Sequence, residues 1–141
     1  MVATDPPNQR DWIQFDDPRA AGSDADVIKV MSWNSLCDYS ATYTQFGYTP
    51  EHARSWDHRK DMIVKEITGL NPDIVCLQEI DNDNFHNWFR PQLAIEGYKG
   101  FYWPRTRFRT MAEKDQKRVD GCAMFYKDHK SVVNIHCACF Y

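Results

Sequence analysis

The chain has 141 residues, of which 43% are hydrophobic and 14% aromatic, and its formal net charge is −3. This length corresponds to one domain or part of one, and the aromatic content excludes a disordered chain because so many rings need a packed interior. The small negative charge excludes a protein that coats nucleic acid by bulk charge, although a local basic patch is compatible with it.

Residues 1–26 are rich in Pro, Asp, Ala and Gly, and they are expected to form a flexible arm or linker that docks through Trp12. They show neither the basic start nor the apolar stretch of a secretory signal. Nor does the sequence contain an apolar run near 18 residues, which excludes a transmembrane helix and a membrane partner.

Five cysteines, an odd number, occur without a secretory signal, and most of them lie in apolar runs. This pattern favours reduced, buried thiols in a protein of the cytoplasm or nucleus. Cys137 and Cys139 would share one face of a strand, but nothing nearby supplies a second pair at zinc-site spacing. Packing is therefore favoured over metal binding for these two thiols.

The first half of the chain predicts a strand, a helix and a second strand. Residues 27–36 alternate as a half-buried strand, with Asn34 at its carboxyl end, and an aromatic-rich loop follows. A helix is predicted from Asp57, as N-cap, to Asn71-Pro72, which ends it. Its apolar face is expected to consist of Met62, Ile63, Ile67 and Leu70. The strand 73–79 then begins at once.

The second half predicts a helix over 83–95, which Pro91 would break or offset, and then a strand over 97–103. A charged loop over 105–118 leads to two strands, 119–127 and 131–141, joined by a tight turn. The order therefore begins as an alternating α/β unit and ends in antiparallel pairs. Because the last apolar strand has no covering element after it, we expect the chain to be a fragment.

Asn34 and Glu79 each lie at the carboxyl end of a predicted strand, where ligands collect in α/β sheets. If the helix between them is a right-handed crossover, the strands are parallel and the two side chains face one another. One carboxylate and one amide would form part of a Mg²⁺ site, with water and phosphate as further ligands. Pairing of Glu79 with an Arg or Lys and a turn-forming role for Asn34 are the alternatives.

The charged loop carries three arginines with an aromatic residue between them, Arg105, Arg107, Phe108 and Arg109. Guanidinium groups bind phosphate and an aromatic ring stacks on a base, so the loop is a candidate RNA-binding segment; a solvated loop is the alternative. Asp128-His129 is an acid–histidine pair, but its place in a tight turn favours a turn-forming role over catalysis.

Several blocks together resemble the nuclease domain of the carbon catabolite repressor type of mRNA deadenylase, a poly(A)-specific ribonuclease of the endonuclease/exonuclease/phosphatase superfamily. The similarity spans about residues 27–133, and YTP and TMAEKD resemble its fungal members. LQE alone indicates only the superfamily, whereas W-x-x-R-K, F-x-P-x-L-x-x-x-G-Y and VDGCA-x-F are typical of deadenylases. The blocks that carry the resemblance are VMSWNSLCDYSATY, SWDHRKDMIVKEI, NPDIVCLQEID, FRPQLAIEGYKGFYWPRTR and TMAEKDQKRVDGCAMFYK.

The resemblance implies a four-layer α/β sandwich, with two sheets face to face and helices outside. It also implies Mg²⁺-dependent 3′→5′ hydrolysis of poly(A) RNA to 5′-AMP, within a complex of deadenylase subunits. Glu79 matches the magnesium-binding glutamate of the family. Asn34 matches the asparagine that supports the metal and the scissile phosphate.

Other parts of the family pattern, a Gly-Asp-Phe-Asn block and a late Ser-Asp-His block, do not occur in this sequence. Residues 27–141 are therefore expected to be the first half of the nuclease domain, which would be inactive by itself. A non-catalytic fragment or interaction module is the main alternative. A phosphatase or abasic-site endonuclease of the same superfamily is a third possibility, against which the VDGCA block and the aromatic loop argue.

Overall fold

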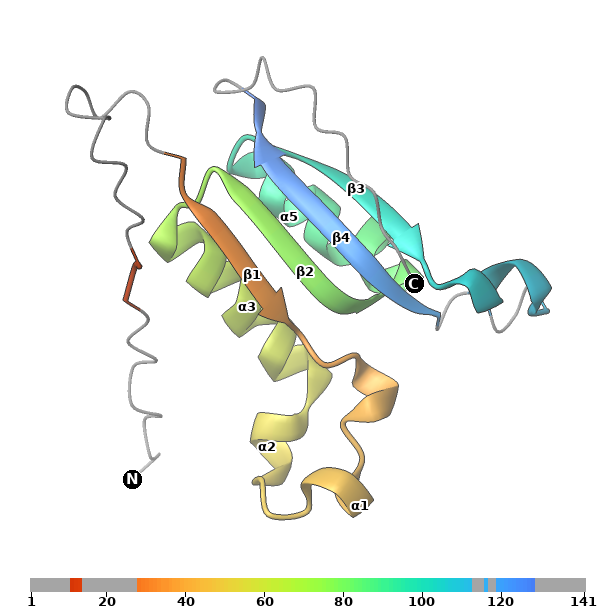
Figure 1. The fold of residues 1–141 in the computed structure, drawn as a ribbon. Helices are drawn as coiled ribbons and strands as arrows, with labels where there is room; N and C mark the ends of the chain where they lie inside the picture. Colours follow the sequence, from red (N-terminus) through yellow and green to blue (C-terminus); the bar gives the residue numbers. More distant parts are fainter. Residues whose placement is uncertain (1–10, 14–27, 113–115, 117–118, 129–141) are drawn as a thin grey trace, which may run out of the picture.

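The computed structural model describes residues 11–13, 28–112, 116 and 119–128, which form one mixed sheet with helices against one face (Figure 1). The sheet has the strand order β1-β2-β4-β3. Its strands are β1 (Val30–Asn34), β2 (Ile74–Asp81), β3 (Tyr98–Pro104) and β4 (Asp120–Lys127). The predicted strand 131–141, His129, Cys137 and Cys139 lie outside the described residues.

The strand pairing confirms the predicted change of topology along the chain. β1 and β2 are parallel neighbours, with Asn34 opposite Gln78. β2 and β3 both pair antiparallel with β4. The parallel pair is joined by a helical crossover, as parallel strands require, and its two carboxyl ends meet at one rim of the sheet.

The helix between β1 and β2 is α3 (Trp56–Leu70), and its start differs from the prediction. Ser55 occupies the N-cap position, while Asp57 lies in the first turn, where a carboxylate still interacts favourably with the helix dipole. The end agrees with the prediction. Asn71 adopts the left-handed conformation at φ 51°, and its N–H donates to the carbonyl of Ile67 at 2.9 Å.

The apolar face of α3 is narrower than predicted. Ile63 and Ile67 are buried and Leu70 packs against the core, whereas Met62 is 37% exposed. Adjacent residues of a helix are separated by about 100° of rotation, so Met62 cannot share the centre of the stripe with Ile63.

The segment predicted as one aromatic-rich loop contains three short helical turns instead. They are the 3₁₀ turn η2 (Asp38–Ser40), α1 (Tyr43–Phe46) and α2 (Glu51–Arg54). Each is too short to show a hydrophobic period, which explains why the sequence pattern did not reveal them.

The second predicted helix is present, and its irregularity agrees with the expected effect of Pro91. It runs through α4 (Asn82–Asn84), the π-helical η3 (Phe85–Phe89) and α5 (Arg90–Ile95). Pro91 falls in the first turn of α5, where a residue without an N–H is tolerated. The helix begins at Asp81, whose carboxylate accepts from the N–H of Asn84 at 2.8 Å.

The core lies between the sheet and these helices. It includes Ile63 and Ile67 of α3, Phe85, Phe89 and Leu93 of the second helical stretch, and Val75, Leu77, Ile80, Ala123 and Phe125 of the sheet. On the opposite face of the sheet, Phe101 and Trp103 are exposed, and no described helix covers them (Figure 1). In the described part of the chain, none of the helices has the length and apolar character needed to cross a membrane.

Candidate active site at the rim of the sheet

The carboxyl ends of β1 and β2 bring Asn34 and Glu79 together, as the sequence predicts. Nδ2 of Asn34 donates a hydrogen bond of 2.8 Å to Oε1 of Glu79. Asn34 is exposed and Glu79 is half-buried, so the pair lies at the surface with one side open to a ligand. Parallel pairing of the two strands is what places these distant residues at the same rim.

A β-bulge directs Glu79 to this rim. The register of β2 with β4 shifts between Gln78 and Ile80, and Glu79 adopts a positive φ of 56°. With regular alternation Glu79 would follow Val75 and Leu77 onto the helix-covered face. The extra residue puts Ile80 in that buried position instead and turns the carboxylate outward.

Ser35 holds the bulged segment against β1. Its N–H donates to the carbonyl of Gln78 at 2.9 Å. Its hydroxyl lies 2.8 Å from the carbonyl oxygen of Gln78 and 3.0 Å from that of Glu79. Left-handed backbone at a residue other than glycine costs about 1–3 kcal/mol and persists only where neighbouring groups hold it. The buried Ser35 is such a group.

The orientation of the Asn34 amide is fixed at both ends, which limits its possible role. Oδ1 accepts from the N–H of Leu36 at 2.9 Å, while Nδ2 donates to Glu79. One of the two lone pairs of the amide oxygen is therefore engaged, and Nδ2 orients the carboxylate of Glu79. Oε2 of Glu79 lies 3.9 Å from Sγ of the buried Cys37.

The donor set at this rim fits a hard divalent cation in part. A half-buried carboxylate at a strand end is the kind of ligand that Mg²⁺ takes, with water and substrate phosphate as the others. The described residues contain no group of three or more His, Cys, Asp or Glu side chains that could hold a metal ion. A cation held here would have Glu79 as its one carboxylate from the described residues, a donor set that suits a substrate-assisted Mg²⁺ site better than a closed zinc site.

A second polar cluster surrounds the first residue of β4. The side chain of Asp120 is 2% exposed, and its carboxylate binds Nε of Arg105 at 2.7 Å and Nη2 of Arg107 at 2.6 Å. The hydroxyl of Tyr39, in η2, donates to the same carboxylate. Burial, together with the hydrogen bond to Asp120, raises the pKa of Tyr39 above its ordinary value.

The predicted RNA-binding loop is partly organised by this cluster. Arg105 precedes the 3₁₀ turn η4 (Thr106–Thr110) and Arg107 lies within it. Their side chains are 50% and 48% exposed although both contact Asp120. Arg109 is exposed and Phe108 is half-buried. Sequence reasoning missed Asp120 and Tyr39; an aspartate at the start of an apolar strand, close to three arginines, was the available signal.

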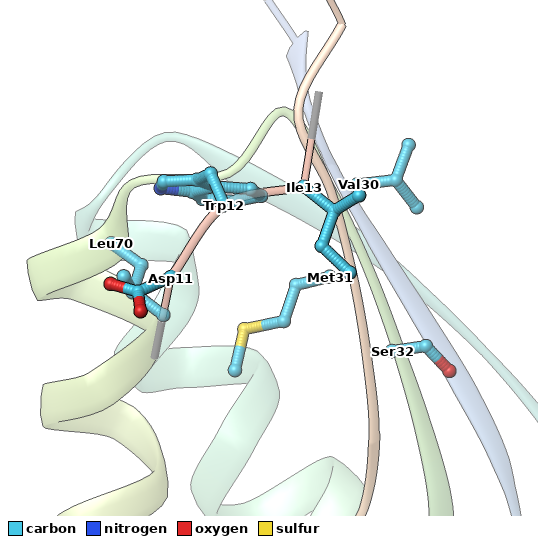
Figure 2. Close-up of a pocket in the computed structure, with 7 residues that line it drawn as sticks. All are labelled: Asp11, Trp12, Ile13, Val30, Met31, Ser32 and Leu70. Atoms are coloured by element: carbon cyan, nitrogen blue, oxygen red, sulfur yellow. The ribbon is translucent and has the colours of Figure 1, made fainter. Parts of the chain in front are cut away.

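A pocket of about 480 Å³ lies away from both clusters, at the opposite end of β1 from Asn34 (Figure 2). The indole of Trp12 lies across it from Met31, and the ammonium of Lys29 is 5.8 Å from the centre of that ring. Trp12 lines this pocket but remains 43% exposed, and the boundary of the predicted arm at residue 26 lies outside the described residues. The pocket is lined by Asp11, Trp12, Ile13, Val30, Met31, Ser32 and Leu70.

Comparison with protein families gives one match, to the endonuclease/exonuclease/phosphatase family, over residues 31–138. This range includes Asn34, Glu79, Asp120 and the segment with Arg105, Arg107 and Arg109, called the arginine loop below.

Among curated proteins, the chain is 48% identical over 133 residues to the CCR4-Not complex 3′-5′-exoribonuclease subunit Ccr4 of Aspergillus oryzae. That alignment covers 94% of this chain and 18% of the relative. The protein of the same name from Phaeosphaeria nodorum is 47% identical over 127 residues, covering 90% of this chain and 21% of the relative. The chain thus spans about a fifth of the length of these relatives.

The chain is also similar to solved protein structures, at lower sequence identity. The human Nocturnin catalytic domain with bound sulfate is 30% identical with a TM-score of 0.54, covering 72% of this chain and 33% of that one. ANGEL2, a 2′,3′-cyclic phosphatase, is 28% identical with a TM-score of 0.56, covering 72% of this chain and 27% of that one. The similarity therefore extends over the greater part of the chain in both sequence and fold.

Proposed function

The chain belongs to the endonuclease/exonuclease/phosphatase family, and we propose that the full-length protein carrying this sequence is a 3′→5′ exoribonuclease that shortens mRNA poly(A) tails. Relatives named as exoribonuclease subunits, at 47–48% identity, support the nuclease assignment. The deadenylase-type blocks of the sequence support poly(A) RNA as the substrate, and the names of the relatives support partner subunits of a CCR4-Not type complex. Such a protein would act in the cytoplasm and nucleus.

The observation that carries the proposal is the outward turn of Glu79 at the β2 bulge, with Asn34 bound to one oxygen of its carboxylate. A carboxylate placed at this rim is suited to hold Mg²⁺. When bound, that cation supplies positive charge that stabilises the phosphate during phosphodiester hydrolysis. Asn34 holds the carboxylate in one orientation.

The arginine loop is proposed to bind the RNA. Arg105 and Arg107 are held by Asp120 yet remain half exposed, so their outer N–H groups are available to phosphate. Arg109 would add a further cation, and Phe108 would stack on a base. Because phosphate contacts of this kind carry no sequence information, they position the strand without selecting adenine.

Hydrolysis also needs a group that orients the attacking water. The Gly-Asp-Phe-Asn and Ser-Asp-His blocks that the family resemblance associates with the rest of the site do not occur in these 141 residues. We therefore propose that residues 1–141 alone do not cleave RNA, and that they contribute the Glu79 half of the site. A purely non-catalytic interaction module is the alternative for the isolated chain.

A phosphatase is the second candidate function, favoured by the similarity to ANGEL2. One experiment separates the two. The full-length protein is incubated with Mg²⁺ and 5′-labelled poly(A) RNA that ends either in a 3′-hydroxyl or in a 2′,3′-cyclic phosphate. An exoribonuclease shortens the first RNA progressively. Removal of the cyclic phosphate without shortening would contradict the proposal and support the phosphatase.

A further inference from the structure

We propose that Arg59, the arginine of the W-x-x-R-K block, is a positioning residue that sets the Asn34–Glu79 pair through the backbone of Leu36. The inference rests on the proposed function in that the pair is taken as the metal-binding half of the site. Arg59 itself does not contact Glu79. It lies on α3, behind the segment that follows β1.

The guanidinium of Arg59 joins three backbone carbonyls from two parts of the chain. Nε donates to the carbonyl of Arg54 at 3.0 Å. Nη1 donates to the carbonyls of Ser35 at 2.9 Å and of Leu36 at 2.5 Å. The group also lies over the Trp56 ring, 4.9 Å from its centre, which fixes its plane. Arg59 therefore connects Ser35 and Leu36, the segment after β1, to the end of α2 and the start of α3.

The clamped segment contains a strained residue. Leu36 has a positive φ of 54°, a conformation that costs a residue with a side chain about 1–2 kcal/mol. Glu79, on the other side of Asn34, has a positive φ as well. Two of the three positive-φ residues other than glycine in the described part of the chain thus flank Asn34, the third being the helix cap Asn71. Strain of this kind persists only where bonds such as those of Arg59 hold it.

The peptide plane between Ser35 and Leu36 decides where the Leu36 N–H points, and Arg59 holds this plane by donating to the Ser35 carbonyl at 2.9 Å. In the structure this N–H donates to Oδ1 of Asn34 at 2.9 Å, which leaves Nδ2 of the same amide to donate to Glu79 at 2.8 Å. If this peptide plane turned, the N–H would no longer face Asn34, and the amide of Asn34 would be free to rotate. A path therefore leads from Arg59 through the Ser35–Leu36 peptide and Asn34 to the carboxylate of Glu79.

A lysine cannot reproduce this clamp. Its ammonium is a compact charge, whereas the planar fork of arginine reaches several acceptors in fixed directions. Burial lowers the pKa of the Arg59 guanidinium, and the nearby Asp38 and Cys37 act in the opposite direction. Arg59→Lys therefore keeps the positive charge and removes the geometry, which makes it the informative substitution.

The test compares Arg59→Lys with Arg90→Lys, a control at an exposed arginine of α5, in the full-length protein. For Arg59→Lys we expect kcat on poly(A) RNA to fall about 10–100-fold, the usual loss when a residue supporting a metal ligand is changed, with KM little altered. The affinity for Mn²⁺, measured by titration without RNA, should fall by a similar factor. The control should leave both quantities unchanged.

Leu36→Gly tests the path itself, because glycine adopts a positive φ without strain. In the Leu36→Gly background, Arg59→Lys should cost less kcat and less Mn²⁺ affinity than in the wild type. An equal or larger loss would contradict a route through Leu36.

The NMR signal of the Asn34 side-chain amide provides a readout that depends on neither metal nor RNA. Arg59→Lys should move this signal toward that of a free carboxamide, whereas Arg90→Lys should not. If the wild type does not cleave RNA, the proposed function fails, and the Asn34 signal still decides the role of Arg59. A lower melting temperature with unchanged Asn34 signal, Mn²⁺ affinity and kcat would overturn the inference. Arg59 would then stabilise the fold without positioning the Asn34–Glu79 pair.

Discussion

Asn34 donates its Nδ2 hydrogen bond to Oε1 of Glu79 across 45 residues of sequence, at a distance of 2.8 Å. The donor is neutral, and no salt bridge to Glu79 is present among the residues that the structure describes. The expected alternative, an arginine or lysine partner for Glu79, is therefore not what these residues form. An amide donor orients the carboxylate without placing a positive charge beside it, which leaves that place for a cation.

The glycines of the sheet and of α3 should respond in opposite ways to alanine. A Cβ at Gly121 would lie 2.2 Å from the carbonyl oxygen of Trp103, so Gly121→Ala must displace β3 next to the bulge. We expect a loss of about 2 kcal/mol in the free energy of unfolding, within the range for overpacked sites. Gly69, in the last turn of α3, has nothing within 4 Å, and Gly69→Ala should stabilise by about 0.5–1 kcal/mol. Denaturant unfolding of both variants measures this contrast, and similar values would contradict it.

Asp120 should matter more for stability than an exposed acid does. Asp120→Asn removes the charge that binds Arg105 and Arg107, and we expect a loss on the order of 2 kcal/mol because charge-assisted hydrogen bonds at a buried acceptor are broken. Asp128→Asn is the matched control, since its 2.7 Å ion pair with Lys99 is largely exposed and should contribute less than about 1 kcal/mol. Thermal unfolding of the two variants tests this difference. Equal effects would mean that the cluster does not stabilise the rim.

Alkaline pH should destabilise the protein through Tyr98. This residue is 4% exposed, and its hydroxyl donates to the carbonyl of Pro72 at 2.5 Å. Burial raises the pKa of Tyr98 from 10.0 to about 12. Between these pH values the unfolded phenol ionises while the folded one keeps its proton, so stability is full below pH 10 and falls by about 2 kcal/mol by pH 12. Tyr98→Phe should remove this part of the slope in unfolding experiments at pH 9–12; an unchanged slope would contradict the assignment.

The arginine loop can be tested by the salt dependence of RNA binding. Arg109 is exposed, so Arg109→Gln should weaken binding of poly(A) RNA while leaving the unfolding free energy within about 0.5 kcal/mol of the wild type. The slope of log K against log salt should decrease by about 0.7, the value for one phosphate contact on a single strand. Arg90→Gln, on α5, removes the same charge elsewhere and should change neither quantity. Identical slopes for wild type and Arg109→Gln would exclude a phosphate contact at this position.

The sequence predicts the elements with a clear period, and it predicts that Asn34 and Glu79 meet near the carboxyl ends of two of them. β1, β2 and α3 were recognisable because alternation and the Asn71-Pro72 stop are local signals, and the position of Asn34 beside Glu79 followed from parallel pairing. The bulge at Glu79 was not predictable, since a register shift depends on β4, which lies 40 residues further along. The outward turn of a carboxylate within the buried strand β2 therefore has a tertiary cause.

The other features that the sequence did not predict correctly also depend on tertiary contacts. The sequence predicts Asp57 as the cap of α3, but Ser55 occupies that position because α2 ends directly before it. The partners of Asp120 come from η2 and from the segment after β3, and no local pattern connects them. In the sequence, Arg59 is distinguished only by its place in the W-x-x-R-K block. Its hydrogen bonds to the carbonyls of Ser35 and Leu36 are visible only in three dimensions.

The most direct test of the proposed function is the activity of Glu79→Gln in the full-length protein, measured with 5′-labelled poly(A) RNA and Mg²⁺. The substitution keeps the shape of the side chain and its contact with Asn34 but removes the charge that would bind the cation. We predict progressive 3′ shortening by the wild type and a loss of about 10²–10³ in rate for the variant, corresponding to several kcal/mol of charge stabilisation, with an unchanged melting temperature. Near-normal shortening by Glu79→Gln would contradict the central claim.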